Sequence, residues 1–490
     1  MLSSVFERRD LVWVAALLLC ALLLGGGGPH SPLAVAVIEA LAAFVLLRFS
    51  FRDHRVVGRG GLSGITAILL LLLVGLAQLA PLPASIWAAF PGRSPLASAL
   101  DLTGRAGAPW PISFDPQTSR DALLSFLPPI AMFIAVLHLG WSDRRRLMVV
   151  LLAVGVASVC LGFLQVASGD TSFFNPYKLP PYGLAVGFFA NRDHQGLFMA
   201  SCFALTMAVY LEMRNERRSA PRHPVWMIAL LAIFAATALA TASRSGAGLL
   251  ALAALGGALV WQMRVSRRHG GLRSRLRRLS RRRGVLIASA LGVGLLILLG
   301  FLLAGSYQFQ RLVDRYSQVS SDARLQFWPD VLYVLKLYFP VGAGFGTFGS
   351  IYQASEPLNE LGLKYLNHAH DDYMELVIEC GLMGVVLIAV FFLWYGRRLW
   401  ALWRRPADQP GRALMSGAAA VILFTLLHSI VDYPLRTEAI SCLFALCCGM
   451  LVSPTIVERR RHRRLSSRRS QSREHREAEQ IADQMEYGPA

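Results

Sequence analysis

Polar residues that could carry out chemistry gather at a few positions beside long apolar runs of the sequence. A charge in or next to a membrane-spanning segment is costly, so it needs a partner, a water-filled cavity or a functional role. Histidine can accept a proton near neutral pH, and the planar guanidinium of arginine binds phosphate through two hydrogen bonds. The sequence therefore indicates acid–base chemistry on a substrate that carries phosphate. The residues concerned are Glu39, Asn191, Arg192, Asp193, His194, Arg244, Arg324, His368, His370, Asp371, Asp372, Glu375, Glu379, His428 and Asp432.

Each of these residues also has a structural interpretation. An arginine at the outer end of a helix can be an interfacial anchor whose side chain reaches the lipid headgroups. His368 and His370, taken alone, are explained as readily by packing within a loop. Glu375 and Glu379 lie four residues apart on one helical face, where pairing with arginines of another segment explains them at least as well as catalysis. Two arginines together with a histidine and outward helix ends favour the functional interpretation.

The histidine and acidic residues between His368 and Glu379 offer enough ligands for a zinc or magnesium ion. The pattern H-A-H-D-D, however, is not a standard ligand spacing, and nearby arginines would compete with a metal ion for any phosphate. The glycine-rich segment GAGFGTFG, residues 342–349, lacks the G-K-[ST] ending of a nucleotide-binding loop. We therefore expect no metal ion and no other cofactor.

The composition is that of a membrane protein. Of the 490 residues, 54% are hydrophobic and only 16% are charged, and the mean hydropathy is +0.47. A soluble domain is nearer a quarter charged, so a soluble enzyme is excluded. The net charge of +19 comes from arginines in short stretches between apolar runs, which favours a role in topology over nucleic-acid binding. All seven cysteines lie in or at the ends of apolar runs, so neither a disulfide framework nor a zinc knuckle is indicated.

Apolar runs long enough to cross a bilayer recur along the chain, and we predict an all-α integral membrane protein with about twelve transmembrane helices. A membrane domain over residues 1–453 is followed by a basic tail, residues 454–490, which we expect to be cytoplasmic and disordered. The spans are expected near residues 11–26, 33–48, 62–80, 122–140, 147–167, 184–211, 224–241, 245–263, 285–305, 373–395, 413–431 and 436–453.

The distribution of positive charge predicts the orientation. With the N-terminus in the cytoplasm, 37 of the 49 lysine and arginine residues fall on inner segments, and both termini are then inside. The densest inner stretch, residues 264–283, is expected to contact anionic lipid. Two long outer loops result, residues 81–121 and residues 306–372, and the second separates spans nine and ten. In that loop, residues 322–339 are predicted to form an amphipathic helix with Leu325, Trp328, Leu332, Leu335 and Tyr338 on its apolar face.

Spans six, eight and ten then begin at the outer surface, where their unpaired N–H groups favour anions. Ser243 is a candidate N-cap for span eight, directly before Arg244. Asp371 or Asp372 is a candidate N-cap for span ten, directly after His370. Arg324, in the outer loop, could supply a second guanidinium for a phosphate.

Five motifs, in the same order, resemble those of the O-antigen ligase and O-antigen polymerase superfamily of bacterial envelope glycosyltransferases. They cover residues from about 185 to 440, while the first five spans are similar mainly in hydropathy. The motifs are FFANRDHQGLF (188–198), TASRSGAGLL (241–250), RLQFWPDVLYVLKLYFPVGAGFGTFGSIY (324–352), NHAHDDYMELVIECGLMGVV (367–386) and HSIVDYPLRTEA (428–439).

The resemblance implies which residues act. The catalytic histidine of the family falls on His370, and its two arginines that bind the substrate diphosphate fall on Arg244 and Arg324. The sequence departs from the family pattern at Asp371 and Asp193, which stand where asparagine is usual, and His368 is an additional histidine with no assigned role. As supporting residues we expect His368, Asp371, Glu375, Arg192 and Asn191.

The implied reaction transfers a glycan from undecaprenyl diphosphate to an acceptor sugar at the periplasmic face of the bacterial inner membrane. The acceptor is the lipid A core in a ligase and a lipid-linked repeat unit in a polymerase, and the sequence does not separate the two. Transfer is expected to invert the anomeric centre, with His370 as base, without a metal ion. The expected partners are the lipid-linked donor, the acceptor glycan and membrane lipids, but no nucleic acid. The alternative is a transporter or lipid flippase for an envelope precursor, because intramembrane charges and twelve spans are equally typical of those proteins.

Overall fold

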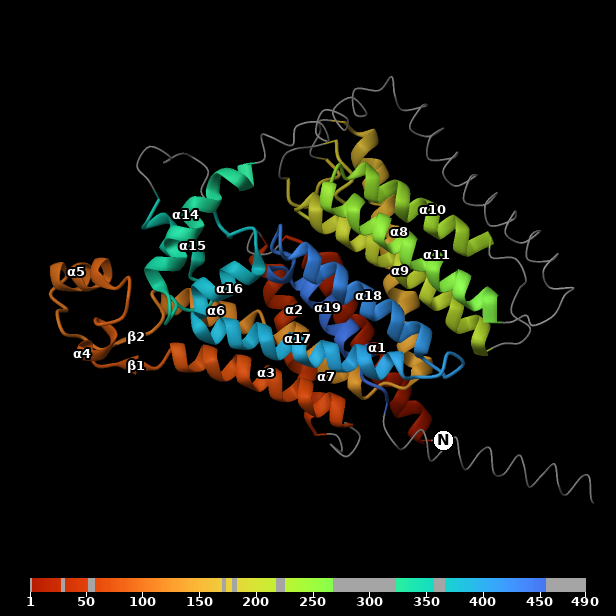
Figure 1. Ribbon diagram of the computed structural model, residues 1–490, viewed down its shortest axis with the longest axis horizontal. Coiled ribbons are helices and arrows are strands. Elements are labelled where there is room, and N and C mark those ends of the chain that lie inside the picture. Colours follow the sequence, from red (N-terminus) through yellow and green to blue (C-terminus); the bar gives the residue numbers. More distant parts are fainter. Residues whose placement is uncertain are drawn as a thin grey trace, which may run out of the picture.

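The computed structural model describes residues 2–27, 31–51, 58–169, 173–178, 183–216, 225–267, 323–356 and 366–454. Long helices dominate this part of the chain (Figure 1). They are α1 (Leu2–Leu24), α2 (Pro32–Ser50), α3 (Arg59–Gln78), α7 (Leu127–Leu137), α8 (Trp141–Ala167), α9 (Arg192–Glu216), α10 (Val225–Ala240), α11 (Arg244–Arg267), α17 (Leu382–Trp403), α18 (Arg412–His428) and α19 (Glu438–Met450).

The helices confirm an all-α membrane protein. Within the described ranges, six segments are long and apolar enough to cross a membrane, and four shorter apolar helices accompany them. The six are Pro32–Ser50, Gly60–Gln78, Pro116–Leu137, Trp141–Ala167, Arg192–Asn215 and Leu382–Trp403. The count of twelve spans and their orientation stay predictions, and the ninth predicted span, residues 285–305, lies outside the described residues.

Two predicted spans differ from the helices that form. The sixth was expected from residue 184, but α9 begins at Arg192, because Gly187 has a φ of +57° and Asn191 Oδ1 accepts the Asp193 N–H at 2.8 Å. The tenth was expected as one helix, but Gly381, with a φ of +58°, divides it into α16 (Asp372–Cys380) and α17. A Cβ at Gly381 would lie 2.0 Å from the carbonyl oxygen of Pro340, so glycine alone fits this close approach.

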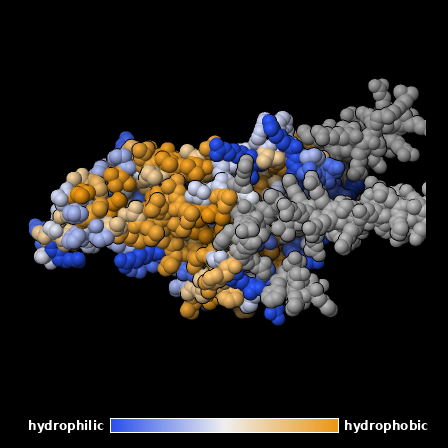
Figure 2. All heavy atoms as spheres, turned by 90° about the horizontal axis from the view of Figure 1, so that it is seen from below, coloured by the Kyte–Doolittle hydropathy of each residue, from blue (hydrophilic) through white to orange (hydrophobic). Residues whose placement is uncertain are grey.

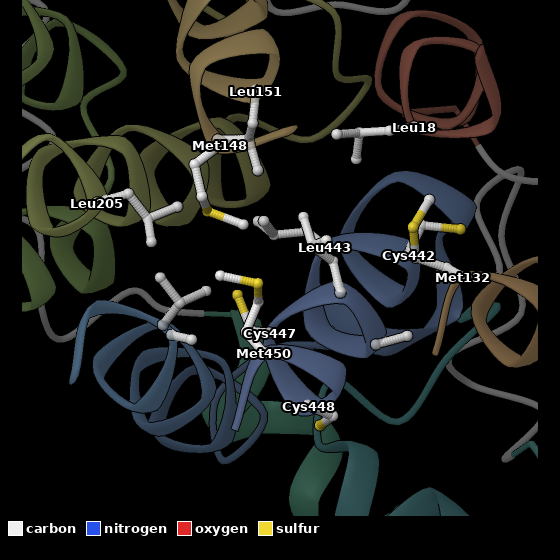
Figure 3. Close-up of a cluster of buried hydrophobic side chains, with 14 of the residues drawn as sticks. Leu18, Met132, Met148, Leu151, Leu205, Cys442, Leu443, Cys447, Cys448 and Met450 are labelled. Atoms are coloured by element: carbon white, nitrogen blue, oxygen red, sulfur yellow. The ribbon is translucent and has the colours of Figure 1, made fainter. Parts of the chain in front are cut away.

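The helices pack around α19, which lies in the middle of the core. Its Cys442, Leu443 and Met450 are fully buried. Figure 3 shows these side chains facing Leu18 of α1 and Leu205 of α9, with Met132, Met148 and Leu151 close by. Because a helix buried on all sides must be apolar around its whole circumference, the composition of α19 suits its central place.

The two predicted outer loops pack against each other at one end of the molecule (Figure 1). The first contains β1 (Pro81–Leu82), α4 (Ala84–Trp87), α5 (Ser94–Leu102), β2 (Trp110–Pro111) and the start of α6 (Pro116–Leu124), and the second contains α14 (Ala323–Tyr338) and α15 (Phe348–Gln353). β1 and β2 pair antiparallel. Phe114 N donates to the Ala343 carbonyl at 2.7 Å, and Ser119 Oγ donates to the Phe345 carbonyl at 2.7 Å. The contacts join segments more than 220 residues apart in the chain.

The predicted amphipathic helix forms as α14, but a different face is buried. Val331, Val334 and Tyr338 are 1–3% exposed, whereas Trp328 and Leu332 are 36% and 37% exposed. Of the expected apolar face, Tyr338 packs inside the protein, while Trp328 and Leu332 lie at the surface, where the sequence had placed them either along the membrane or on the bundle. Periodicity alone could not distinguish two neighbouring stripes that are both apolar.

Apolar side chains also cover the outside of the helices. On α3, Leu69, Leu73 and Leu76 are 60–63% exposed. Figure 2 shows a broad hydrophobic area over the middle of the visible face, with hydrophilic residues toward the end where the outer loops lie. An apolar surface of this extent is what a lipid environment requires.

Candidate functional site

The loop between His368 and Asp371 carries the predicted catalytic histidine at the start of α16. His370 has a φ of +53°, a conformation that residues other than glycine rarely adopt. Asp371 follows in extended conformation and accepts the N–H groups of Tyr373 and Met374, each at 2.9 Å. This confirms Asp371 as an N-cap and fixes the histidine directly before the positive end of a helix.

A buried carboxylate on a distant segment holds His370. Nδ1 of His370 lies 3.3 Å from Oδ1 of Asp432, which follows α18. The Asp432 side chain is fully buried, while that of His370 is 26% exposed. The ring is therefore held at Nδ1 from the inside of the protein and presents its other edge to the accessible side.

Asp432 is itself held by groups from three segments. Its Oδ1 accepts the Tyr433 N–H at 3.0 Å, and its Oδ2 accepts Asn191 Nδ2 at 3.0 Å. Nε2 of His428 and Nε2 of His194 lie 3.5 Å and 3.8 Å from Oδ2. Burial alone would raise the pKa of the Asp432 carboxyl, but His370, His428 and His194 outweigh burial and hold it well below its usual range. Asp432 therefore stays ionised and fixes the orientation of His370.

The second histidine of the loop has its own carboxylate. Nδ1 of His368 lies 2.8 Å from Oε1 of Glu375, and Oε2 of the same side chain accepts the Ala369 N–H at 2.8 Å. Glu375 thereby joins the first turn of α16 to the two residues that precede His370.

Arg436 neutralises the acidic face of α16. This residue of the short helix η3 (Pro434–Arg436) contacts both carboxylate oxygens of Glu379, at 3.3 Å and 2.9 Å. Its Nε lies 3.4 Å from Glu375 and 3.8 Å from Asp372. Pairing of these glutamates with an arginine was the structural interpretation of the sequence, and it is confirmed, with His368 sharing Glu375.

One guanidinium cannot balance three carboxylates, and their pKa values separate accordingly. Because the candidate span starts at Leu382, α16 lies outside it. Burial raises the pKa of Asp372 and of Glu379 to about 7, against the opposing charge of Arg436. Burial would also raise the pKa of Glu375, but Arg436 and His368 outweigh burial and lower it. Glu375 is thus the carboxylate that keeps its charge.

Tyr433 packs against the histidines of the site. Its ring centroid lies 4.3 Å from that of His368, 4.9 Å from that of His370 and 5.6 Å from that of His194. The aromatic ring thus bridges the two histidines of the loop and the N-terminus of α9. Residues 428–436 and the start of α16 form one connected unit.

The N-termini of α9 and α11 lie side by side at the same end of the bundle. A Cβ at Gly196 would lie 3.0 Å from the Cα of Gly246 and 3.2 Å from Ser243. Ser243 Oγ accepts the Gly246 N–H at 3.0 Å, which confirms Ser243 as the N-cap of α11. Arg244 is the first residue of α11 and Arg192 the first residue of α9. Two helix N-termini, each starting with an arginine, therefore lie next to each other, and the first turn of α9 also carries His194.

The contacts bring most of the predicted site residues together. His370, His368, Glu375, Asp371 and Asn191 belong to the network around Asp432 and α16. Arg244 and Arg192 stand at the adjoining helix ends, and the side chain of Arg324 lies outside the described residues. Sequence reasoning missed the roles of Asp432 and Arg436, although Asp432 was singled out as a costly charge and both occur in the motif HSIVDYPLRTEA.

A comparison with known families agrees with this geometry. Residues 228–389 match the family model described as O-antigen ligase. The matched segment includes Arg244, Arg324 and His370, and it ends within α17. A search of curated proteins finds no match. The match confirms the resemblance to the O-antigen ligase and polymerase superfamily, and with the apolar helices it identifies a multi-pass membrane enzyme of the glycan ligase or polymerase type.

Proposed function

We propose that this chain, whose residues 228–389 carry an O-antigen ligase domain, transfers a glycan from undecaprenyl diphosphate to an acceptor sugar hydroxyl at the periplasmic face of the inner membrane. The pairing of His370 with the buried Asp432 carries the proposal. A histidine whose Nδ1–H is held by a carboxylate has a lone pair on Nε2 and can accept a proton there. The helix ends beside it suit the anionic part of the donor.

In this reaction Nε2 of His370 takes the proton of the acceptor hydroxyl. The acceptor oxygen attacks the anomeric carbon opposite the diphosphate, and the bond from that carbon to the diphosphate oxygen breaks. Its electron pair leaves with the diphosphate, so the anomeric centre inverts. Arg244 and Arg324 neutralise the charge that grows on the departing diphosphate. Arg192 adds positive charge at the end of α9, and Asn191 holds Asp432 in place.

The acidic residues of the site are committed to structural partners, which supports a mechanism without a metal ion. Glu375 and Glu379 lie within ion-pair distance of Arg436, and Asp372 Oδ2 accepts the hydroxyl of Ser429 at 2.7 Å. A divalent cation would have to displace the guanidinium of Arg436, whose side chain is 18% exposed, to reach the oxygens of Glu375 and Glu379. Transfer by the purified protein is therefore expected to continue in excess EDTA, and loss of activity that Mg²⁺ restores would overturn this part of the proposal.

The test uses full-length protein in nanodiscs with a polyprenyl diphosphate donor and an acceptor glycan. His370→Gln and Asp432→Asn are each expected to lower the rate at least about 100-fold, because the first removes the base and the second its orientation. His138→Gln is the matched control, since this histidine contacts the Ile134 carbonyl at the end of α7. Full activity of His370→Gln in folded protein would overturn the proposal.

The arginines are tested by replacement with lysine. Arg244→Lys and Arg324→Lys keep a positive charge but lose the fork that binds a diphosphate through two hydrogen bonds, so each is expected to lose most of the activity. An arginine that only anchors a helix end would tolerate lysine. Chain growth with lipid-linked repeat units alone would identify a polymerase, and a requirement for a lipid A core acceptor would identify a ligase.

A further inference from the structure

His368 and Glu375 form a second pair of a histidine and a buried carboxylate, two residues from His370. The side chains of Glu375 and Asp432 are 1% and 0% exposed, whereas the rings of His368 and His370 are 18% and 26% exposed. Both rings are held at Nδ1. Each ring is therefore fixed from the inside of the protein and turns its Nε2 edge toward the accessible side.

The rings of both histidines pack against the same tyrosine. The Tyr433 ring lies at 32° to the ring of His368 and at 66° to the ring of His370, with centroids less than 5 Å away in each case. Within the described part of the chain, neither Nε2 has a hydrogen-bond partner, and neither is among the buried polar atoms that lack one.

We propose that His368 is a second catalytic residue, which donates a proton from Nε2 to the departing diphosphate while His370 accepts the proton of the acceptor hydroxyl. The proposal rests on the function proposed above. Displacement at an anomeric carbon needs a base on the side of attack and charge stabilisation on the side of the leaving group. Because both rings pack against one tyrosine, a single bound sugar can lie within reach of both histidines.

Every proton and electron pair that moves in this step has a donor and an acceptor within the site. The bond between the acceptor oxygen and the anomeric carbon forms as the bond between that carbon and the diphosphate oxygen breaks. The acceptor proton passes to Nε2 of His370, and the proton on Nε2 of His368 passes to the leaving oxygen, which keeps the electron pair. Transfer of a proton from His370 to His368 through solvent restores the starting state.

The surroundings suit a protonated His368. The Glu375 carboxylate lies 2.8 Å from Nδ1 and stabilises a positive charge on the ring. Burial of Glu375 opposes its ionisation, but Arg436 and the ring of His368 lower the pKa of the carboxyl. Arg436 Nε lies 3.4 Å from the same Oε1 of Glu375 that the His368 ring contacts, and Glu379 and His194 also interact electrostatically with His368. The ring of Tyr433 packs against the imidazole.

The pH dependence of single-turnover transfer tests the proposal. The wild-type rate is expected to rise with pH as His370 loses its proton and to fall at higher pH as His368 loses its own. His368→Gln is expected to lower the maximal rate by about 10- to 100-fold and to abolish the fall at high pH. A histidine with a purely structural role would lower the rate but leave the bell shape unchanged, and that result would overturn the proposal.

Two further variants distinguish failure of the proposed role of His368 from failure of the proposed function. Glu375→Gln keeps an oxygen for the Ala369 N–H but removes the charge beside His368, so the fall in rate should move to lower pH. An unchanged profile in this variant would overturn the proposal even where His368→Gln does not fold. His370→Gln tests the base separately, and full activity of this variant would overturn the proposed function. If His370→Gln is inactive and the pH profile of His368→Gln is still bell-shaped, only the proposed role of His368 is overturned.

Discussion

At the level of single residues, the site depends on largely buried charges that are each paired with an opposite charge or a hydrogen-bond donor. Asp432, Glu375 and Arg436 are each held by partners from a different part of the chain, and each would be costly to bury alone. His370 adds a strained backbone, with a φ of +53°, which the cap at Asp371 and the contact with Asp432 maintain. Removal of one partner is therefore expected to disturb the others.

The raised pKa values of two carboxyl groups in α16 predict how the free energy of unfolding depends on pH. Folding raises the pKa of Asp372 and Glu379 to about 7 from 3.8 and 4.5, so between these values the folded protein binds more protons than the unfolded chain. Their contribution is complete below the unfolded values and is lost as the pH rises through about 7. The lowered pKa values of Glu375 and Asp432 act in the opposite direction, but only at acidic pH.

Glu379→Gln tests this prediction, because glutamine resembles the protonated carboxyl and does not titrate. The wild-type free energy of unfolding is expected to fall on the order of 2 kcal/mol between about pH 5 and about pH 8, and the variant should show a smaller fall. Thermal unfolding in detergent at several pH values measures it. Equal slopes for the two proteins would show that Glu379 does not hold a proton in the folded state.

Among the helices, the close crossing of α9 and α11 brings the two arginine-bearing N-termini together. The crossing depends on Gly196 and Gly246, because a Cβ on Gly246 would lie 2.9 Å from the Cα of Gly196. Small residues at such contacts let two membrane helices approach closely. The distance between Arg192 and Arg244 is thus set by two glycines rather than by either arginine.

Gly246→Val is expected to push the helices apart, with a cost of about 1 to 3 kcal/mol and a larger loss of transfer than of folded protein. Gly248 lies one half-turn further along α11 and has open space around its Cβ position, so Gly248→Ala is the control and should retain activity. Both variants are compared for melting temperature and for rate. A normal transfer rate for Gly246→Val would show that the close approach of α9 and α11 is not needed for activity.

For the whole molecule, the packing of the two outer loops places residues 81–121 and 342–346 on one side. Hydrogen bonds between Phe114 and Ala343 and between Ser119 and Phe345 allow no membrane between them. The site at the start of α16 joins the same assembly, because the Gln78 side chain bonds the Glu379 carbonyl and the Phe345 N–H. The orientation of this assembly follows from the arginine distribution and is testable as a unit.

Cysteine labelling in intact spheroplasts checks the orientation. Leu102→Cys, at a position that is 88% exposed in α5, should react with a membrane-impermeant reagent. Asp408→Cys, at an exposed position between α17 and α18, should react only after permeabilisation. The parent chain is the control for the native cysteines. The reverse labelling pattern would show that the membrane orientation is opposite to the predicted one and would contradict a periplasmic location of the site.

The sequence by itself determined those features that depend on near neighbours. Apolar runs predicted the helices, and the caps at Ser243 and Asp371 were predicted from residues within one helical turn of the atoms they bind. The spacing of Glu375 and Glu379 also indicated pairing with an arginine, as an alternative to catalysis, and Arg436 provides that partner. Local hydrogen bonding and burial of apolar surface act over a few residues, so a single chain displays them directly.

Only the tertiary structure decided which distant partners complete the site. His370 and Asp432 are 62 residues apart in the chain, and Asn191 and Asp432 are 241 apart. Their contacts depend on how α9, α16 and α18 pack, which no local pattern specifies. The break at Gly381 and the buried face of α14 also follow from packing, because each depends on the surface that lies opposite. A charge in an apolar setting shows that a partner is needed, and the fold determines which residue that partner is.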